Sequence, residues 1–138
     1  MIQTNNYLRE VEGSFDGEVM WGDDNKVYPV PPNYASKSKL VEGDRLKLRI
    51  GMDGAFVFKQ IGPVGRKRLV GKVTVEMKVL AEGKVYDILT PSMTYYKAEP
   101  GDDAVISIPI DGHPTWAALE NIIENTDQDK ELTNEYPR

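Results

Sequence analysis

Apolar and polar residues alternate along several short stretches of the chain, and a period of two is typical of half-buried β-strands. The clearest alternation is in residues 45–50, where leucine and isoleucine take turns with arginine and lysine. Residues 51–54, Gly-Met-Asp-Gly, follow directly. Asp-Gly between alternating runs is a strong hairpin signal, so we expect residues 55–61 to return as the partner strand.

The same pattern predicts further strands on either side of this hairpin. Residues 15–21 alternate, and the turn-forming residues 22–25 separate them from a short apolar run at 27–30. Residues 73–79 alternate more regularly, and they are followed by a turn at 81–83. A last strand is expected over 104–108. Residues 1–12 have few apolar side chains, and we expect either a frayed end or a short edge strand there.

One stretch near the C-terminus has helical spacing instead. Pro114 suits the first turn of a helix, where its missing N–H group costs nothing. Trp116, Leu119, Ile122 and Ile123 then recur at intervals of three and four residues, as on the apolar face of an amphipathic helix. This pattern predicts a helix over residues 114–125.

Residues 26–50 and 84–108 are two copies of one sequence pattern, aligned without a gap at an offset of 58 residues. Lys26-Val27-Tyr28 corresponds to Lys84-Val85-Tyr86, and Gly43-Asp44 corresponds to Gly101-Asp102. The correspondence extends back to Gly13 and Gly71. Two strand–strand–connection–strand repeats are therefore predicted, over residues 13–50 and 71–108.

Together these elements predict a mainly β fold. Two such repeats, paired about a pseudo-twofold axis, would close into a small β-barrel, and closure would remove exposed strand edges. We expect one domain over residues 1–125, with the C-terminal helix covering one end of the barrel. Residues 126–138 are polar and acidic, and their composition predicts a disordered tail.

Charge is distributed unevenly along the 138 residues. The formal net charge is −5, but residues 37–78 contain eleven basic and four acidic side chains, a net charge of +7. The flanking residues 1–36 and 81–138 have net charges of −4 and −8. A basic middle between acidic ends indicates that the middle of the chain binds either an anionic partner or the chain's own acidic tail.

Other features of the composition exclude whole classes of protein. The chain has no cysteine, which removes disulfides, thiol nucleophiles and thiolate zinc sites. No apolar run approaches the length of a transmembrane helix, and the N-terminus lacks the features of a secretory signal. We therefore expect a cytoplasmic protein that neither spans nor binds a membrane.

The Gly-Asp pairs at 43–44 and 101–102 each follow polar residues and open an alternating strand. This pattern resembles the GD box of the cradle-loop barrels, which include AbrB-type swapped-hairpin modules, RIFT barrels and double-psi barrels. Glycine permits a tight turn into the strand, and the aspartate can accept backbone N–H bonds across it.

Residues 25–61 resemble the AbrB type most. Gly43 follows Pro31 by twelve residues, as the glycine of that family's Gly-Asp follows its Ile-Pro. The resemblance implies DNA contacts by basic residues of the connection, here Lys37 and Lys39. The chain departs from the family in lacking Leu-Gly at the end of the connection. The strings SKSKL, KQIGP and WAALENI are also similar to uncharacterised bacterial proteins, which implies no function.

The basic side chains of the middle segment are the candidate nucleic-acid contacts, because outward-facing cations on paired strands can neutralise phosphates. They are Lys37, Lys39, Arg45, Lys47, Arg49, Arg66, Lys67 and Arg68. Phe56 and Phe58 could stack on bases, although phenylalanines at such positions more often belong to the core. The alternative is that the basic side chains form an ordinary solvated strand face.

A second set of residues suggests a protein partner. Tyr95 and Tyr96 are adjacent in the second connection, where aromatic side chains can form a recognition surface. The helix containing Trp116 would either cover the barrel end or form a dimer contact, so a monomer and a homodimer both remain open.

No catalytic set is recognisable. Residues 65–72, GRKRLVGK, fail the phosphate-loop spacing, and the single histidine, His113, has no partners at metal-ligand spacing. We therefore expect no enzyme activity, no metal and no cofactor. The sequence predicts a nucleic-acid-binding regulator or accessory factor. The alternative is an interaction module of a larger ribonucleoprotein or transcription assembly.

Overall fold

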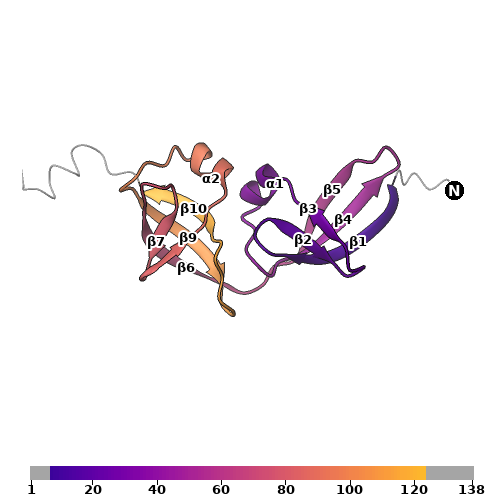
Figure 1. Ribbon diagram of the computed structural model, residues 1–138, viewed down its shortest axis with the longest axis horizontal. Helices are drawn as coiled ribbons and strands as arrows, with labels where there is room; N and C mark the ends of the chain where they lie inside the picture. Colours follow the sequence, from indigo (N-terminus) through magenta and orange to yellow (C-terminus); the bar gives the residue numbers. More distant parts are fainter. Residues whose placement is uncertain (1–6, 124–138) are drawn as a thin grey trace, which may run out of the picture.

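In the computed structural model, which describes residues 7–123, the chain forms two five-stranded antiparallel sheets and two short helices (Figure 1). The first repeat contains β1 (Tyr7–Phe15), β2 (Val19–Gly22), β3 (Val27–Pro29), α1 (Pro32–Lys37), β4 (Arg45–Gly51) and β5 (Phe56–Gly62). The second contains β6 (Arg66–Val73), β7 (Val79–Ala81), β8 (Lys84–Tyr86), α2 (Thr90–Tyr95), β9 (Asp103–Pro109) and β10 (Ala118–Ile123). The mainly β prediction is confirmed.

Each repeat builds one sheet, and the two sheets have the same strand order. That order is β3-β2-β1-β4-β5 in the first and β8-β7-β6-β9-β10 in the second. The register of the central pairs is also repeated. Gly13 lies opposite Leu46 in the first sheet, and Gly71 lies opposite Ala104 in the second. The sequence repeat at an offset of 58 residues is therefore a repeat of strand pairing as well.

The closed pseudo-twofold barrel predicted over residues 13–108 is not confirmed. Among the described residues, no strand of one sheet pairs with a strand of the other. Closure into one barrel would require the edge strands of the two sheets, β3, β5, β8 and β10, to pair across the repeats. Within residues 7–123, each of them pairs only with a neighbour of its own repeat.

Each sheet packs its own apolar core beneath its helix. Leu46, Leu48 and Met20 are fully buried in the first core, and Ala104 and Ile106 are fully buried in the second. Met20 belongs to β2, and the other four lie on the inward faces of β4 and β9, as the alternating pattern of both strands predicted. Tyr34, beside Phe58, completes an aromatic contact between α1 and the first sheet.

The helix predicted over residues 114–125 is wrong. Residues 118–123 form β10, which pairs with β9, while residues 114–117 lead into it. The pairing register shifts between Leu119 and Asn121, as at a β-bulge. The bulge places both Leu119 and Ile122 in the core, so an irregular strand produces the three-residue spacing that resembles a helix.

Three other strand predictions need correction. Residues 1–12 were predicted as a frayed end or a short edge strand, but residues 7–12 belong to the central strand β1. The strand predicted over 15–21 is interrupted by a turn at 16–18 between β1 and β2, where Asp16 N donates to the Val19 carbonyl over 3.0 Å. The strand predicted over 73–79 is interrupted, because the chain turns at 74–78 between β6 and β7. Thr74 closes this turn: its N–H group donates to the Lys78 carbonyl over 2.8 Å, and its carbonyl accepts from Met77 N over 2.9 Å. Val75 is consequently 78% exposed.

The predicted role of the two Gly-Asp pairs in shaping a turn agrees with the geometry. Asp44 accepts the Val41 N–H group and Asp102 accepts the Glu99 N–H group, each over 2.9 Å. The glycines before them have φ angles of 95° and 93°, a region that favours glycine. Both repeats therefore enter their fourth strand through the same turn.

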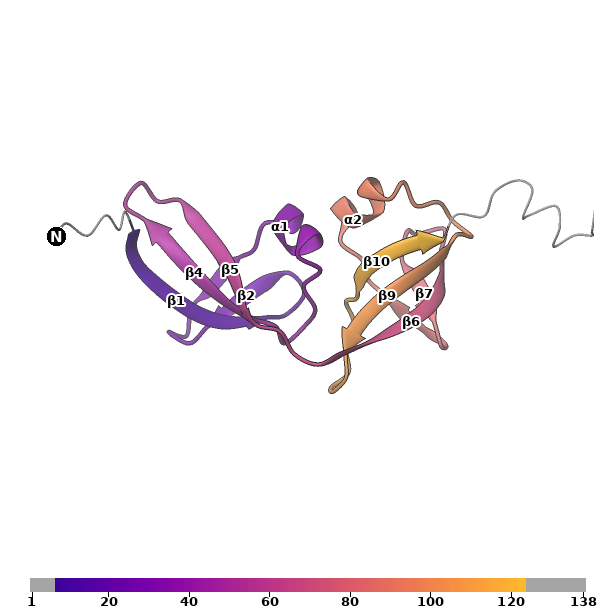
Figure 2. The same ribbon diagram turned by 180° about the vertical axis from the view of Figure 1, so that it is seen from behind.

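The two repeats lie side by side with α1 next to α2, and the connection from β5 to β6 crosses between them on the side away from the helices (Figure 2). Ser36 of α1 and Ser92 of α2 are hydrogen-bonded through their hydroxyls. Leu89, just before α2, packs against the core of the first repeat. The Trp116 ring lies against Gly17, where a Cβ atom would approach the ring to 2.3 Å.

Within residues 7–123, no helix is long and apolar enough to cross a membrane. The tail predicted over residues 126–138 lies outside the described residues.

Candidate functional site

Three of the predicted basic residues lie on the outer face of the first sheet, on β4. Each is close to a carboxylate: Arg45 to Asp23 at 2.5 Å, Arg49 to Glu10 at 2.7 Å and Lys47 to Glu10 at 3.9 Å. The hydrogen bond from Arg45 holds the pKa of Asp23 below its ordinary value. Positive and negative side chains therefore lie side by side on this face, because the neighbouring strand β1 has glutamates where β4 has cations.

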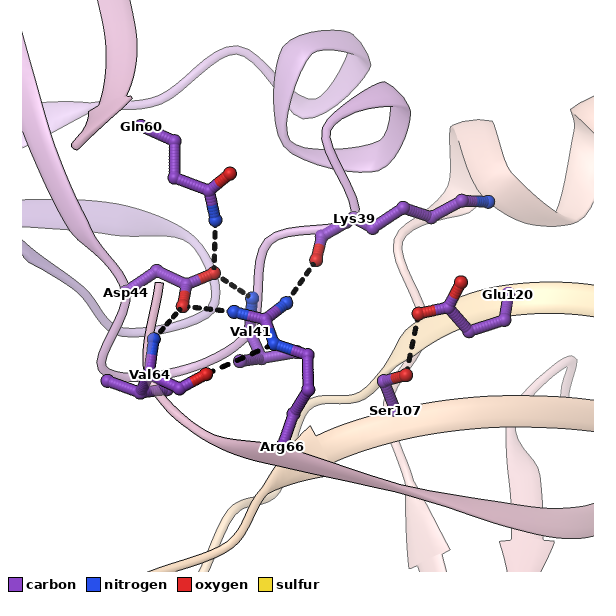
Figure 3. Close-up of polar contacts among 8 residues, drawn as sticks. All are labelled: Lys39, Val41, Asp44, Gln60, Val64, Arg66, Ser107 and Glu120. Atoms are coloured by element: carbon purple, nitrogen blue, oxygen red, sulfur yellow. Dashed lines mark hydrogen bonds and ion pairs between the residues drawn. The ribbon is translucent and has the colours of Figure 1, made fainter. Parts of the chain in front are cut away.

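Arg66 has a structural role. Its guanidinium is hydrogen-bonded and ion-paired to the fully buried Asp44, and it donates to the Lys39 carbonyl over 3.0 Å and the Val64 carbonyl over 3.2 Å (Figure 3). The Asp44 carboxylate also accepts from Gln60 Nε2, Val41 N and Val64 N, at 2.9–3.0 Å. This network holds the connection between β5 and β6 against the end of α1.

Lys67 and Arg68 lie further along β6, opposite Ile108 and Ser107 of β9. Both are exposed, and neither forms an ion pair with any residue that the structure describes. They lie on a different strand and sheet from the three basic residues of β4. The eight predicted residues therefore do not form one continuous face.

The remaining two predicted residues, Lys37 and Lys39, line a pocket of about 490 Å³ between α1 and α2. The pocket is lined by Asn33, Ser36, Lys37, Lys39, Pro91, Tyr95 and Tyr96. These residues include two lysines and two tyrosines but no carboxylate. The structure thus brings together the connection lysines and the paired tyrosines, which the sequence analysis assigned to different partners.

Lys39 joins the two repeats at the floor of this pocket. Its backbone has a φ of 55°, a left-handed conformation, as does the equivalent Lys97 at 53°. The side chain extends toward the second repeat (Figure 3), where Nζ donates to the Tyr96 hydroxyl over 2.6 Å and to the Leu119 carbonyl over 2.8 Å. The Tyr96 hydroxyl in turn donates to the Glu120 carbonyl over 2.9 Å. Lys39 and Tyr96 therefore hold each other in place.

Lys37 and Tyr95 form the accessible part of the pocket. Lys37 is exposed at the end of α1 and forms no ion pair with another described residue. Tyr95 is 78% exposed, and its ring meets that of Tyr96 edge to face, with centroids 4.9 Å apart. An exposed ring beside an exposed ammonium can stack on a planar group and attract an anion at the same time.

A second pocket of about 510 Å³ lies on the other side of α2, within the second repeat. It is lined by Glu76, Met77, Lys78, Asp87, Ile88, Thr90, Met93, Thr94, Lys97, Ala98 and Trp116. Lys78 and Asp87 form an ion pair at 2.7 Å, and this hydrogen bond raises the pKa of Lys78. The sequence analysis missed this pocket, although the offset of 58 residues places its Lys97 opposite Lys39 in the repeat.

The adjacent aspartates Asp23-Asp24 and Asp102-Asp103 have structural partners. Asp24 accepts a hydrogen bond from Tyr28, which lowers the pKa of Asp24, and Asp103 is ion-paired with Lys72 at 2.6 Å. Among residues 7–123, no group of three or more histidines or acidic residues could hold a metal ion.

The region around Trp116 differs from the expected helical interface. Glu42 of the first repeat accepts the Thr115 and Trp116 N–H groups through Oε2, at 3.0 and 2.9 Å. Together with the contact between Trp116 and Gly17, these bonds fix the segment before β10 against the first repeat. Trp116 thus joins the two repeats, and its ring also lines the second pocket.

Comparison with known proteins adds no relative: no protein-family model, no curated protein and no solved structure matches this chain.

Proposed function

We propose that the protein binds single-stranded nucleic acid in the pocket between α1 and α2. The observation that carries this proposal is that Lys37 and Lys39 share a pocket with Tyr95 and Tyr96 in which no carboxylate takes part. Proteins that bind single strands combine cations along the backbone with aromatic rings on which bases stack. The exposed pair, Lys37 and Tyr95, supplies one group of each kind.

The contrast with the first sheet supports the choice of this site. On β4 the cations lie beside carboxylates of Glu10 and Asp23, so a phosphate would have to displace an existing partner. Lys37 has no such partner among the described residues. The resemblance of residues 25–61 to AbrB-type modules points to the same connection, since that family contacts DNA there. On this proposal the protein is a non-enzymatic regulator or accessory factor of the cytoplasm.

Oligonucleotide binding across a salt series tests the proposal directly. We expect fluorescence anisotropy to show binding of labelled 12-nucleotide single strands at low salt, and weaker binding of the matching duplex. Lys37→Gln should reduce the slope of log K against log salt by about one, because one phosphate contact is lost. Tyr95→Ala should weaken binding by about 1–3 kcal/mol, the usual contribution of one stacked base.

Lys59→Gln is the matched control for charge. Lys59 is an exposed lysine on β5 that lines neither pocket, so its loss should change neither affinity nor salt slope. Absence of binding at low salt, with and without residues 126–138, would refute the proposal. An equal loss in Lys59→Gln and Lys37→Gln would refute the choice of site.

A protein partner is the second candidate function, and one specific observation favours it. Both repeats expose an apolar cross-strand pair at equivalent positions: Trp21 beside Val27 in the first, and Leu80 beside Val85 in the second. Exposed apolar groups at matched positions suit two similar docking segments on a larger assembly. Substituting Trp21 and Leu80 with serine should then abolish co-purification with that assembly without changing oligonucleotide binding.

A further inference from the structure

The helix α2 separates the two pockets, and its faces divide between them. Pro91, Tyr95 and Tyr96 line the pocket between the helices. Thr90, Met93, Thr94 and Lys97 follow at intervals of three and four residues and line the pocket of the second repeat. A strand that stacks on Tyr95 therefore needs only to cross one short helix to reach the second pocket.

The wall of the second pocket is apolar and contains an aromatic ring. Met93 and Ile88 are buried residues of the second core, and Met77 and Trp116 are partly buried beside them. Methionine sulfur makes favourable contacts with aromatic rings, and its unbranched chain adapts to different shapes. At about 510 Å³, the pocket has the size of small-molecule sites. It suits a planar aromatic group.

Met77 is held in an unfavourable backbone conformation at the mouth of this pocket. Its φ is 64°, a region where residues other than glycine are uncommon, and the turn closed by Thr74 fixes it there. The corresponding loop between β1 and β2 has a glycine, Gly17, at positive φ. Strained residues of this kind concentrate at ligand sites, and the Met77 side chain both packs against the second core and lines the pocket.

The rim of the pocket contributes polar groups of a particular kind. Lys78 and Asp87 satisfy each other, which leaves Glu76 as the exposed carboxylate. An ionised carboxylate accepts hydrogen bonds and donates none. The exocyclic amino groups of cytosine, adenine and guanine are donors, whereas thymine and uracil have no such group. Lys97 lies exposed on the same rim, where a phosphate beside the base would pass.

We propose that the pocket lined by Met77, Met93 and Trp116 holds one amino-bearing base of a single strand bound across α2, with Glu76 accepting from its exocyclic amino group. This inference rests on the proposed function, because the strand must first bind at the pocket between the helices. The inference adds a base preference and a second contact, which the pocket between the helices alone does not provide.

The fluorescence of Trp116 provides the test, since Trp21 is the other tryptophan and lies on the first sheet. In the full-length chain with Trp21→Phe, we expect oligo-dC and oligo-dA to change the Trp116 emission. They should bind about 5–100-fold more tightly than oligo-dT, the usual range for one good base contact. Glu76→Gln should reduce that preference, because an amide can also donate a hydrogen bond.

Met77→Gly is the decisive variant, because glycine adopts a φ of 64° without strain, so the turn keeps its backbone conformation while the side chain is lost. We expect it to weaken oligo-dC binding and the Trp116 response, whereas Val75→Ala, an exposed residue of the same turn, should change neither. An unchanged Trp116 emission at saturating oligo-dC, with Lys37-dependent binding intact, would overturn this inference and leave the proposed function standing. Equal affinity for oligo-dT and oligo-dC would overturn the base preference. Absence of binding by every strand would overturn both proposals.

Discussion

Removing the buried carboxylate of Asp44 should destabilise the protein far more than removing its counterpart in the second repeat. Asp44 is fully buried and accepts from the Val41 and Val64 N–H groups and from Gln60, in addition to its ion pair with Arg66. Asp102 occupies the equivalent turn and is also buried. Among the described residues, its carboxylate accepts only the Glu99 N–H group.

The magnitude follows from what each substitution leaves without a partner. Breaking a buried ion pair by removing one partner costs about 3–5 kcal/mol, and Asp44→Ala also leaves two backbone donors unsatisfied. Because Arg66 reaches the surface, water recovers part of this cost, and we expect a loss of about 4 kcal/mol. Asp102→Ala removes one hydrogen bond and should cost about 1–2 kcal/mol.

Urea unfolding followed by circular dichroism measures both values. The two variants form a matched pair, because each removes one aspartate from the same turn at the same position of its repeat. Arg66→Met should cost nearly as much as Asp44→Ala, and the double variant should cost less than the sum, since the two side chains interact directly. If Asp44→Ala is no more destabilising than Asp102→Ala, the network does not stabilise the fold as its geometry implies.

Three further predictions concern the first repeat and the junction. Gly17→Ala should destabilise more than Gly83→Ala and should shift the Trp116 emission, because both glycines have positive φ but only Gly17 faces the indole ring. Glu42→Gln should lower the unfolding free energy by about 1 kcal/mol and expose Trp116 to acrylamide quenching, and unchanged quenching would contradict its role. Burial raises the pKa of Asp16, but hydrogen bonds from two backbone N–H groups and an indole outweigh it, so the pKa lies below its ordinary value of 3.8. The contribution of the ionised Asp16 carboxylate to folding stability is complete above that value and is lost as the pH falls through the lower folded-state pKa. Asp16→Asn should therefore make the unfolding free energy less sensitive to acid below about pH 4.

The sequence predicted the regular parts of both repeats correctly. Alternation over residues 45–50 and 104–108 identified β4 and β9, because each strand has one face in a core and its side chains must alternate. The turn of Asp44 and of Asp102 was equally predictable, since glycine at positive φ and a carboxylate acceptor are local requirements. Such features depend on a few neighbouring residues.

Strand irregularities escaped the same reasoning. The bulge in β10 gives Leu119 and Ile122 a helical spacing, and only the pairing with β9 makes that segment a strand. The turn at Met77 interrupts an unbroken alternation, because β7 must reverse to pair with β6. In both segments, long-range pairing decided the structure against the local pattern.

The candidate site was likewise only partly predictable from the sequence. Lys37, Lys39, Tyr95 and Tyr96 were each singled out from the sequence, but as contacts for two different partners. Only the packing of α1 beside α2 places them in one pocket, while pairing with β1 surrounds the cations of β4 with carboxylates. The sequence alone determined that the chain has two copies of one β unit, because the repeated turns and alternation are local. The tertiary structure decided that these copies form two separate sheets, because in the described part of the chain the edge strands β3, β5, β8 and β10 pair only within their own repeat.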